Sequence, residues 1–162
     1  MEKKTVIVIN GRSRVGKDTL CEIAERAFKV RNVSSITPVK EIALLYGWDG
    51  VKDERGRKLL IALKKAFTDY NDMPMRYLRD QYNDFKRSDE EIMFVHIREP
   101  QEIERFRKII PCTTLLIKRE SAEVFALEND NDTSKYMYDI VFENNKPLEE
   151  SGQEFIKLLE GL

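Results

Sequence analysis

Short apolar runs alternate along the chain with segments in which apolar residues recur every three or four positions. The first run, at residues 5–9, is β-branched and has no polar interruption, which is typical of a strand covered on both faces of a parallel sheet. Similar runs follow at residues 92–97, 113–117 and 139–142, with a weaker one at 35–37. Because these runs alternate with helical segments, the pattern predicts an α/β fold with a parallel sheet.

The helical segments fall between these runs. A helix is predicted to start near Asp18, because five apolar positions share one face there: Leu20, Ile23, Ala24, Ala27 and Phe28. Pro38 suits the first turn of the next helix. The stretch 48–88 has helical periodicity throughout, and further helices are predicted after Pro100 and from about Pro147.

Composition narrows the range of functions. The chain has 162 residues, with 28 Lys and Arg against 29 Asp and Glu, and we expect one domain over residues 1–162. Without a basic block, neither nucleic acid nor an anionic membrane surface is expected as a partner. No apolar run approaches the length of a membrane span or a signal peptide, so a cytoplasmic protein is expected. Cys21 and Cys112 form no CxxC motif and are expected to be reduced thiols.

A glycine-rich loop joins the first predicted strand to the first predicted helix. It has the form GxxxxGK, with Gly11, Gly16 and Lys17 at the defining positions. Glycines let the backbone curl so that successive N–H groups face one anion, and the positive end of the following helix extends that site. The pattern predicts a P-loop for ATP, with Lys17 reaching the β- and γ-phosphates. The residues expected to bind ATP here are Gly11, Arg12, Ser13, Arg14, Val15, Gly16, Lys17, Asp18 and Thr19.

The residue after the loop lysine departs from the usual pattern. A serine or threonine hydroxyl commonly holds Mg²⁺ at that position, whereas this chain has Asp18, with Thr19 one place later. A carboxylate is a good Mg²⁺ ligand, directly or through water. The alternative is that Asp18 only complements the helix dipole and Thr19 supplies the cap. Asp18 and Thr19 are therefore both candidate metal ligands.

The loop and several later segments resemble one branch of the P-loop nucleoside-monophosphate-kinase-like superfamily. Residues 16–19 resemble the GKD[ST] loops of this branch, which includes deoxynucleoside monophosphate kinases and animal-type phosphomevalonate kinase. Four further segments occur in the same order as in this branch. Residues 37–43 look like its DPLKEIA helix entry, and residues 48–60 resemble its KDExxRxLL stretch. Residues 97–102 resemble its VRFPNE turn, and residues 139–150 look like its DxVIxNNGTLEEL ending. The resemblance covers most of the chain.

This resemblance implies an adenylate-kinase-like architecture. The expected fold is a three-layer P-loop NTPase sandwich of about five parallel strands with helices on both faces. A helical acceptor-binding arm would span about residues 48–88, and a short lid about residues 120–138. Asn144 and Asn145 would lie near the adenine and belong to the ATP-binding set.

Phosphoryl transfer depends mainly on positioning and on neutralising negative charge, so cations must converge on the transferred group. Arg55, Arg57 and Arg98 are candidates for binding an anionic acceptor, because a guanidinium fork matches phosphate oxygens bidentately. Arg119 would close over the transferring group. The catalytic set is therefore Lys17, Arg98 and Arg119.

Two features depart from the branch. His96 stands at the strand end where an aspartate is common, and Arg119 is the only arginine after Arg107. The leading hypothesis is an ATP- and Mg²⁺-dependent phosphotransferase acting on a small phosphorylated acceptor, foremost a (deoxy)nucleoside monophosphate. The alternatives are a nucleotide-binding regulatory module that is non-catalytic or slow, and a simple hydrolase. The sequence leaves the acceptor's identity and the oligomeric state open.

Overall fold

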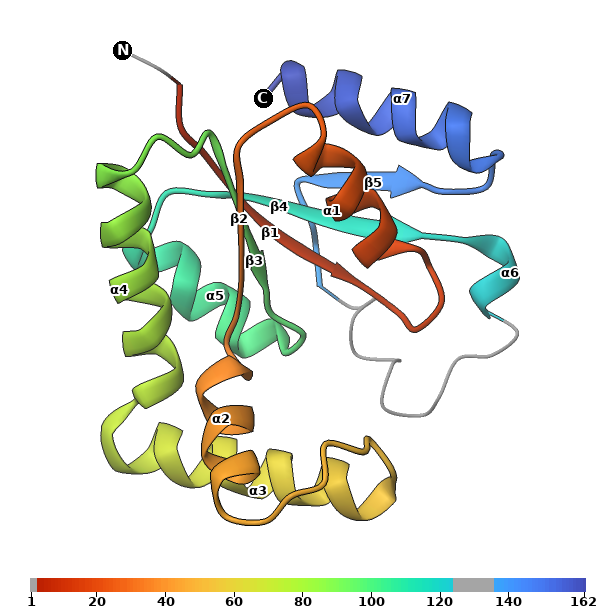
Figure 1. The fold of residues 1–162 in the computed structure, drawn as a ribbon. Helices are drawn as coiled ribbons and strands as arrows, with labels where there is room; N and C mark the ends of the chain where they lie inside the picture. The colour runs from red at the N-terminus through yellow and green to blue at the C-terminus, as the bar shows by residue number, and fades with distance from the viewer. Residues whose placement is uncertain (1–2, 124–135) are drawn as a thin grey trace. The chain divides into compact units, whose positions relative to one another are not determined.

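Strands and helices alternate along the chain (Figure 1), and the computed structural model describes residues 3–123 and 136–162. The strands are β1 (Thr5–Gly11), β2 (Val30–Ser34), β3 (Ile92–His96), β4 (Thr113–Lys118) and β5 (Ile140–Glu143). The helices are α1 (Lys17–Glu25), α2 (Thr37–Leu45), α3 (Glu54–Asn71), α4 (Met73–Arg87), α5 (Pro100–Ile109), α6 (Glu120–Glu123) and α7 (Leu148–Glu160). The chain divides into two compact units, Met1–Asn32 with Ser88–Leu162, and Val33–Arg87.

The sheet has five strands in the order β2-β3-β1-β4-β5. β1 lies at its centre and pairs in parallel on both sides, where Val8 lies opposite Val95 of β3 and Thr114 of β4. β4 in turn pairs in parallel with β5, where Leu116 lies opposite Val141. Since the carboxyl ends of parallel strands meet at one edge of a sheet, the segments that follow these strands gather there. The predicted parallel sheet of about five strands is confirmed.

Helices cover both faces of this sheet. The connection from β1 to β2 runs toward one edge and that from β3 to β4 toward the other, so right-handed crossovers place α1 and α5 on opposite faces. α7 lies beside α1 (Figure 1), where a Cβ on Gly152 would come within 3.1 Å of Ile23 Cδ1. The core under α1 and α7 includes Ile7, Ile9, Leu20, Phe94, Leu115, Ile117, Phe155 and Leu159. On its own side, α5 buries Ile103 and Phe106.

The second unit is built from α2, α3 and α4. Val39 and Ala43 of α2 pack with Leu60 of α3 in a small apolar core. Asp53 caps α3, because its Oδ1 accepts a hydrogen bond from the Gly56 amide at 2.7 Å. The helical pattern predicted for 48–88 is confirmed over α3 and α4, whereas residues 48–53 form no helix. The role of this stretch as an acceptor arm stays a prediction.

One strand prediction is wrong. The weak apolar run at residues 35–37 is not a strand: β2 ends at Ser34, and Thr37 already begins α2. Arg31 and Asn32 interrupt the apolar pattern of β2, but their polar groups have partners elsewhere in the fold. Arg31 Nε donates to Glu90 Oε2 at 2.6 Å, and Asn32 Oδ1 lies 3.0 Å from His96 Nε2.

The expected lid at 120–138 falls largely outside the described residues. Only α6 and residues 136–138 of that stretch are described. Among the helices of the described residues, none combines the length and the apolar character that crossing a membrane requires. Cys21 is buried and Cys112 half-buried, and both are free thiols.

Candidate phosphate-binding site

The glycine loop connects the central strand directly to α1. Gly11 ends β1 and Gly16 precedes Lys17, the first residue of α1, with a φ of +84° that favours glycine. Arg14 is also left-handed, with a φ of +67°, so the chain turns twice within the loop. A Cβ on Gly11 would lie only 2.7 Å from the buried Val15 Cγ2, so this glycine lets the loop fold back onto the end of β1. The expected strand–loop–helix arrangement is present.

Asn144, after β5, holds the loop from within the unit. Its buried side-chain Nδ2 donates a hydrogen bond to the Val15 carbonyl at 2.7 Å, and its backbone N–H donates to the Lys118 carbonyl at 2.7 Å. A trans peptide points its C=O and N–H in opposite directions. Because the Val15 carbonyl faces Asn144, the Gly16 N–H faces away from it.

The two asparagines predicted near the adenine therefore have different surroundings. Asn144 lies against the Val15–Gly16 peptide, whereas Asn145 Oδ1 accepts a hydrogen bond from the backbone N–H of Glu120 at 2.9 Å, at the start of α6. Asn145 is exposed. Contact of either residue with a nucleotide stays a prediction.

Lys17 and Asp18 lie in the electrostatic environment of His96, at the end of β3. The pKa of His96 is lowered to about 4, mainly by burial and also by the charge of Lys17, while the charge of Asp18 opposes both effects. Asn32 Nδ2 donates to Glu25 Oε1 at 2.8 Å, so its Oδ1 is the atom that faces His96 Nε2. The imidazole is therefore neutral near pH 7 and donates from Nε2. A neutral ring occupies the strand end where a carboxylate is common in the branch that the sequence resembles.

Asn10 precedes the loop and was missed by the sequence analysis. Its side chain is fully buried, with Nδ2 donating to the Arg98 carbonyl at 3.1 Å and to the Tyr138 hydroxyl oxygen at 2.9 Å. Its Oδ1 accepts the Gly11 N–H at 2.9 Å. The available signal was an amide at the end of an otherwise apolar strand, because a buried polar group needs partners.

The candidate arginines fall in both units. Arg98 lies two residues past the end of β3, and Arg119 directly follows β4, so both belong to the sheet edge that carries the glycine loop. Both side chains are exposed. Arg55 and Arg57, also exposed, lie in the first turn of α3 in the second unit. The roles assigned to these four residues stay predictions.

Protein ligands for a metal ion are few. Within residues 3–123 and 136–162, no three His, Cys, Asp or Glu side chains come together in a way that would hold an ion. Asp18 and Thr19 lie in the first turn of α1 with exposed side chains. One carboxylate and one hydroxyl fit the manner in which Mg²⁺ is usually bound beside phosphates, with one or two protein oxygens and several waters.

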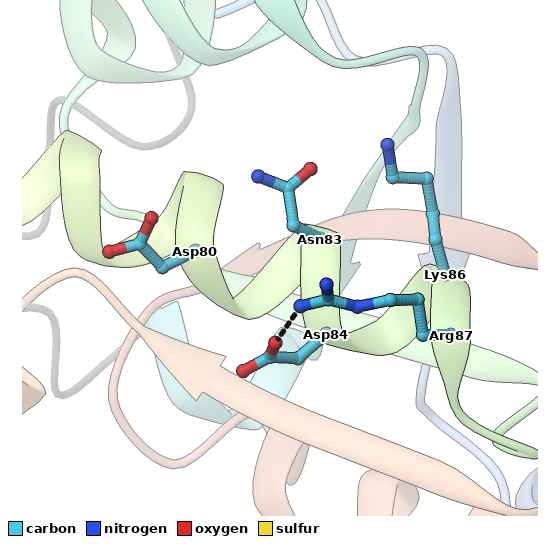
Figure 2. A pocket seen from close by; sticks show the side chains of 5 residues that line it. All are labelled: Asp80, Asn83, Asp84, Lys86 and Arg87. Atoms are coloured by element: carbon cyan, nitrogen blue, oxygen red, sulfur yellow. Dashed lines mark hydrogen bonds and ion pairs between the residues drawn. The ribbon is translucent and has the colours of Figure 1, made fainter.

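A separate hollow of about 500 Å³ lies along α4 in the second unit (Figure 2). Its lining is charged and polar: Asp80, Asn83, Asp84, Lys86 and Arg87. Arg87 Nη2 and Asp84 Oδ1 form an ion pair at 2.7 Å. No candidate site residue lines this hollow, so it is not the phosphate site.

No protein-family model and no curated protein matches the sequence, whereas solved structures match almost its full length. TT1252 from Thermus thermophilus matches with a TM-score of 0.59 and 15% identity, over 99% of this chain and 98% of that one. A sugar kinase from Janibacter matches with a TM-score of 0.58 and 14% identity, over 98% and 95%. Thymidylate kinase from Candida albicans matches with a TM-score of 0.56 and 12% identity, over 98% and 92%. The chain therefore shares the fold of these kinases, while its place in the superfamily that its sequence resembles stays a prediction.

Proposed function

We propose that the protein is an ATP- and Mg²⁺-dependent phosphotransferase that moves the γ-phosphate to a small phosphorylated acceptor, foremost a (deoxy)nucleoside monophosphate. The observation that carries this proposal is the loop 11–19, which lies between the central strand and α1 with its Val15–Gly16 peptide held by Asn144. Similar structures include a thymidylate kinase and a sugar kinase, so the fold supports kinase chemistry without selecting the acceptor.

On the ATP side, the proposed site consists of positively charged or hydrogen-bond-donating groups that would bind the phosphates, and it includes no general base. The Gly16 N–H faces away from Asn144, and the amino end of α1 adds the positive end of a helix dipole. Lys17 stands at that end and would bind the β- and γ-phosphates. These groups stabilise charge that grows during transfer, which is where most of the catalysis of phosphoryl transfer arises.

The residues present fit a magnesium ion held mainly by the nucleotide. Asp18 and Thr19 would hold it, since their side chains are exposed at the amino end of α1. When bound, Mg²⁺ neutralises part of the charge on the β- and γ-phosphates. His96 is neutral and donates to Asn32, so the protein's carboxylate contribution would come from Asp18.

On the acceptor side, Arg98 would bind the phosphate of the acceptor, with Arg55 and Arg57 of the helical arm, about residues 48–88, as further ligands. Arg119 would lie over the transferring group, next to a lid at about residues 120–138. A phosphate acceptor is already a nucleophile at neutral pH, so positioning replaces proton abstraction in this mechanism. The ATP site would be completed by Asn144 and Asn145, and residues 1–162 would act as one domain.

The test is acceptor-dependent ADP release from Mg-ATP, with a panel of nucleoside monophosphates and small phosphorylated metabolites. We expect Lys17→Ala to reduce turnover by about 100-fold or more, as removal of a group that stabilises transition-state charge does. Lys157→Ala, on the exposed part of α7, is the matched control and should leave turnover unchanged. Wild-type turnover in Lys17→Ala would reject the site.

A nucleotide-binding regulatory module is the second candidate. The neutral His96 at the end of β3 and the single arginine beyond Arg107 favour it, because fewer charges are available to drive transfer. This candidate predicts saturable ATP binding without acceptor-stimulated turnover. Turnover that needs no acceptor would instead indicate a hydrolase.

A further inference from the structure

The side chain of Asn10 has every polar atom engaged and none in contact with water. It is 0% exposed, both N–H groups of Nδ2 are donated, and Oδ1 accepts from Gly11. A buried amide satisfied in this way resists rearrangement, because any movement leaves donors or acceptors unpaired in a medium of low dielectric constant. Its neutrality also adds no charge beside the phosphate loop.

Two of these hydrogen bonds reach segments that lie outside the strands, the turn at Arg98 and the residue Tyr138. The parallel pairing of β1 with β3 ends where Ile9 lies opposite His96. Asn10 and Arg98 lie just beyond that last pair, and the bond from Asn10 Nδ2 to the Arg98 carbonyl at 3.1 Å takes over where the ladder stops. The same side chain accepts the N–H of Gly11, the first residue of the phosphate loop.

Tyr138 accepts the second hydrogen bond of Asn10 Nδ2, and contacts of its own hold Tyr138 in place. The next residue, Asp139, exchanges hydrogen bonds with Thr114 of β4: its N–H donates to Thr114 Oγ1 at 2.8 Å, and its Oδ2 accepts the Thr114 N–H at 2.9 Å. The ring of Tyr138 packs edge-on against Tyr136, with centroids 5.0 Å apart. The Tyr138 hydroxyl is therefore a fixed acceptor for Asn10.

We propose that Asn10, supported by the Tyr138 hydroxyl, is a positioning residue that holds the Arg98 turn in place relative to the phosphate loop. The proposal rests on the proposed function, in which Arg98 binds the acceptor phosphate. Removing the hydroxyl loosens the amide on the Arg98 side, while the bond between Asn10 Oδ1 and Gly11 remains. The acceptor side of the reaction then suffers and the donor side does not.

Tyr138→Phe is the appropriate variant, because Asn10→Ala would leave several buried partners unpaired and put folding at risk. We expect kcat/KM for the acceptor to fall about 2- to 10-fold, the range of one neutral hydrogen bond, with the KM for ATP unchanged. Tyr136→Phe is the matched comparison: its hydroxyl bonds Glu104 and Arg107 rather than Asn10, so kcat/KM for the acceptor should fall less than in Tyr138→Phe.

A double-mutant cycle separates positioning of Arg98 from a general structural effect. In an Arg98→Ala background, Tyr138→Phe should cost nothing further, because the group it positions has gone. Full additivity of the two losses would overturn the proposal. The proposal would also be overturned if Tyr138→Phe raised the KM for ATP by the same factor by which it lowers kcat/KM for the acceptor.

A measurement without substrate distinguishes this proposal from the proposed function. Hydrogen–deuterium exchange in a peptide covering residues 96–103 should be faster in Tyr138→Phe than in Tyr136→Phe. Equal exchange in the two variants overturns the positioning role even if the enzyme is active. Faster exchange in a protein without acceptor-dependent turnover supports the link between Asn10 and the Arg98 turn and rejects the kinase assignment alone.

Discussion

Replacing Gly16 with alanine tests the phosphate loop most directly, because the chain contains a matched glycine. Gly16 and Gly50 have φ values of +84° and +83°, so alanine is strained to a similar degree at both. Their surroundings differ. A Cβ on Gly16 would lie 2.6 Å from Asn144 Nδ2, whereas the nearest atom to a Cβ on Gly50 is Leu44 Cδ2 at 3.8 Å.

The expected magnitudes follow from these two situations. A left-handed alanine costs roughly 1–2 kcal/mol, and Gly50→Ala should lose about that much stability. Gly16→Ala must also displace the Asn144 amide from the Val15 carbonyl, which leaves buried polar groups unpaired at a further cost of about 1–3 kcal/mol. We therefore expect a total of about 2–5 kcal/mol for Gly16→Ala, with weaker ATP binding in that variant alone.

Urea unfolding and calorimetric titration with Mg-ATP measure these two effects. A third variant sharpens the test: in an Asn144→Ala background the overlapping amide is absent, so Gly16→Ala should cost only the strain seen at Gly50. That sub-additivity is the signature of a direct contact. Equal destabilisation by Gly16→Ala and Gly50→Ala, or additive costs with Asn144→Ala, would show that Asn144 does not hold the phosphate loop at Gly16.

Three further predictions concern charge and reactivity. His96 takes up a proton near its ordinary pKa of 6.5 in the unfolded chain, but only near pH 4 in the folded protein. The free energy of unfolding should therefore fall as the pH drops through this interval, by up to about 3 kcal/mol. Urea unfolding at pH 7.5 and 4.5 measures this loss of stability. The stability of His96→Gln should depend less on pH than that of the wild type, and an equal dependence would contradict the lowered pKa of His96. Arg98→Ala should raise the KM for the acceptor and leave the KM for ATP unchanged, and an effect on ATP alone would reassign this residue to the donor side. Burial raises the pKa of Cys21 to about 12 and that of Cys112 to about 11. Native protein should therefore react slowly with a thiol reagent at pH 8, and Cys112 should be labelled before Cys21. Fast labelling of Cys21 would contradict its burial.

The strands that could be predicted from the sequence are those whose own residues are apolar enough to indicate burial. β1 and β3 are apolar runs buried on both faces, and periodicity alone places them within two residues of their ends. β2 lies at the sheet edge and contains Arg31, whose partner Glu90 is 59 residues away. No local pattern reveals such a partner, so the strand was predicted at residues 35–37, after β2 has ended, and the last of these residues begins α2.

The site divides in the same way. The turn of the phosphate loop depends on Gly11, Gly16 and Lys17, which are adjacent in sequence and form a recognisable motif. The groups that hold the loop are distant: Asn10 meets Tyr138 across 128 positions, and Asn144 meets Val15 across 129. Their types were visible in the sequence, but their partners depend on the strand order.

The strand order also determines when this site can form during synthesis. β1 emerges from the ribosome first, yet its neighbours β3 and β4 are made only after residues 92 and 113, and Asn144 later still. Most of the contacts of the central strand are therefore long-range, a topology that slows folding. A nascent chain that stops before Asn144 carries the complete glycine motif without the amide that orients it, so nucleotide capture should begin only after Asn144 has been made.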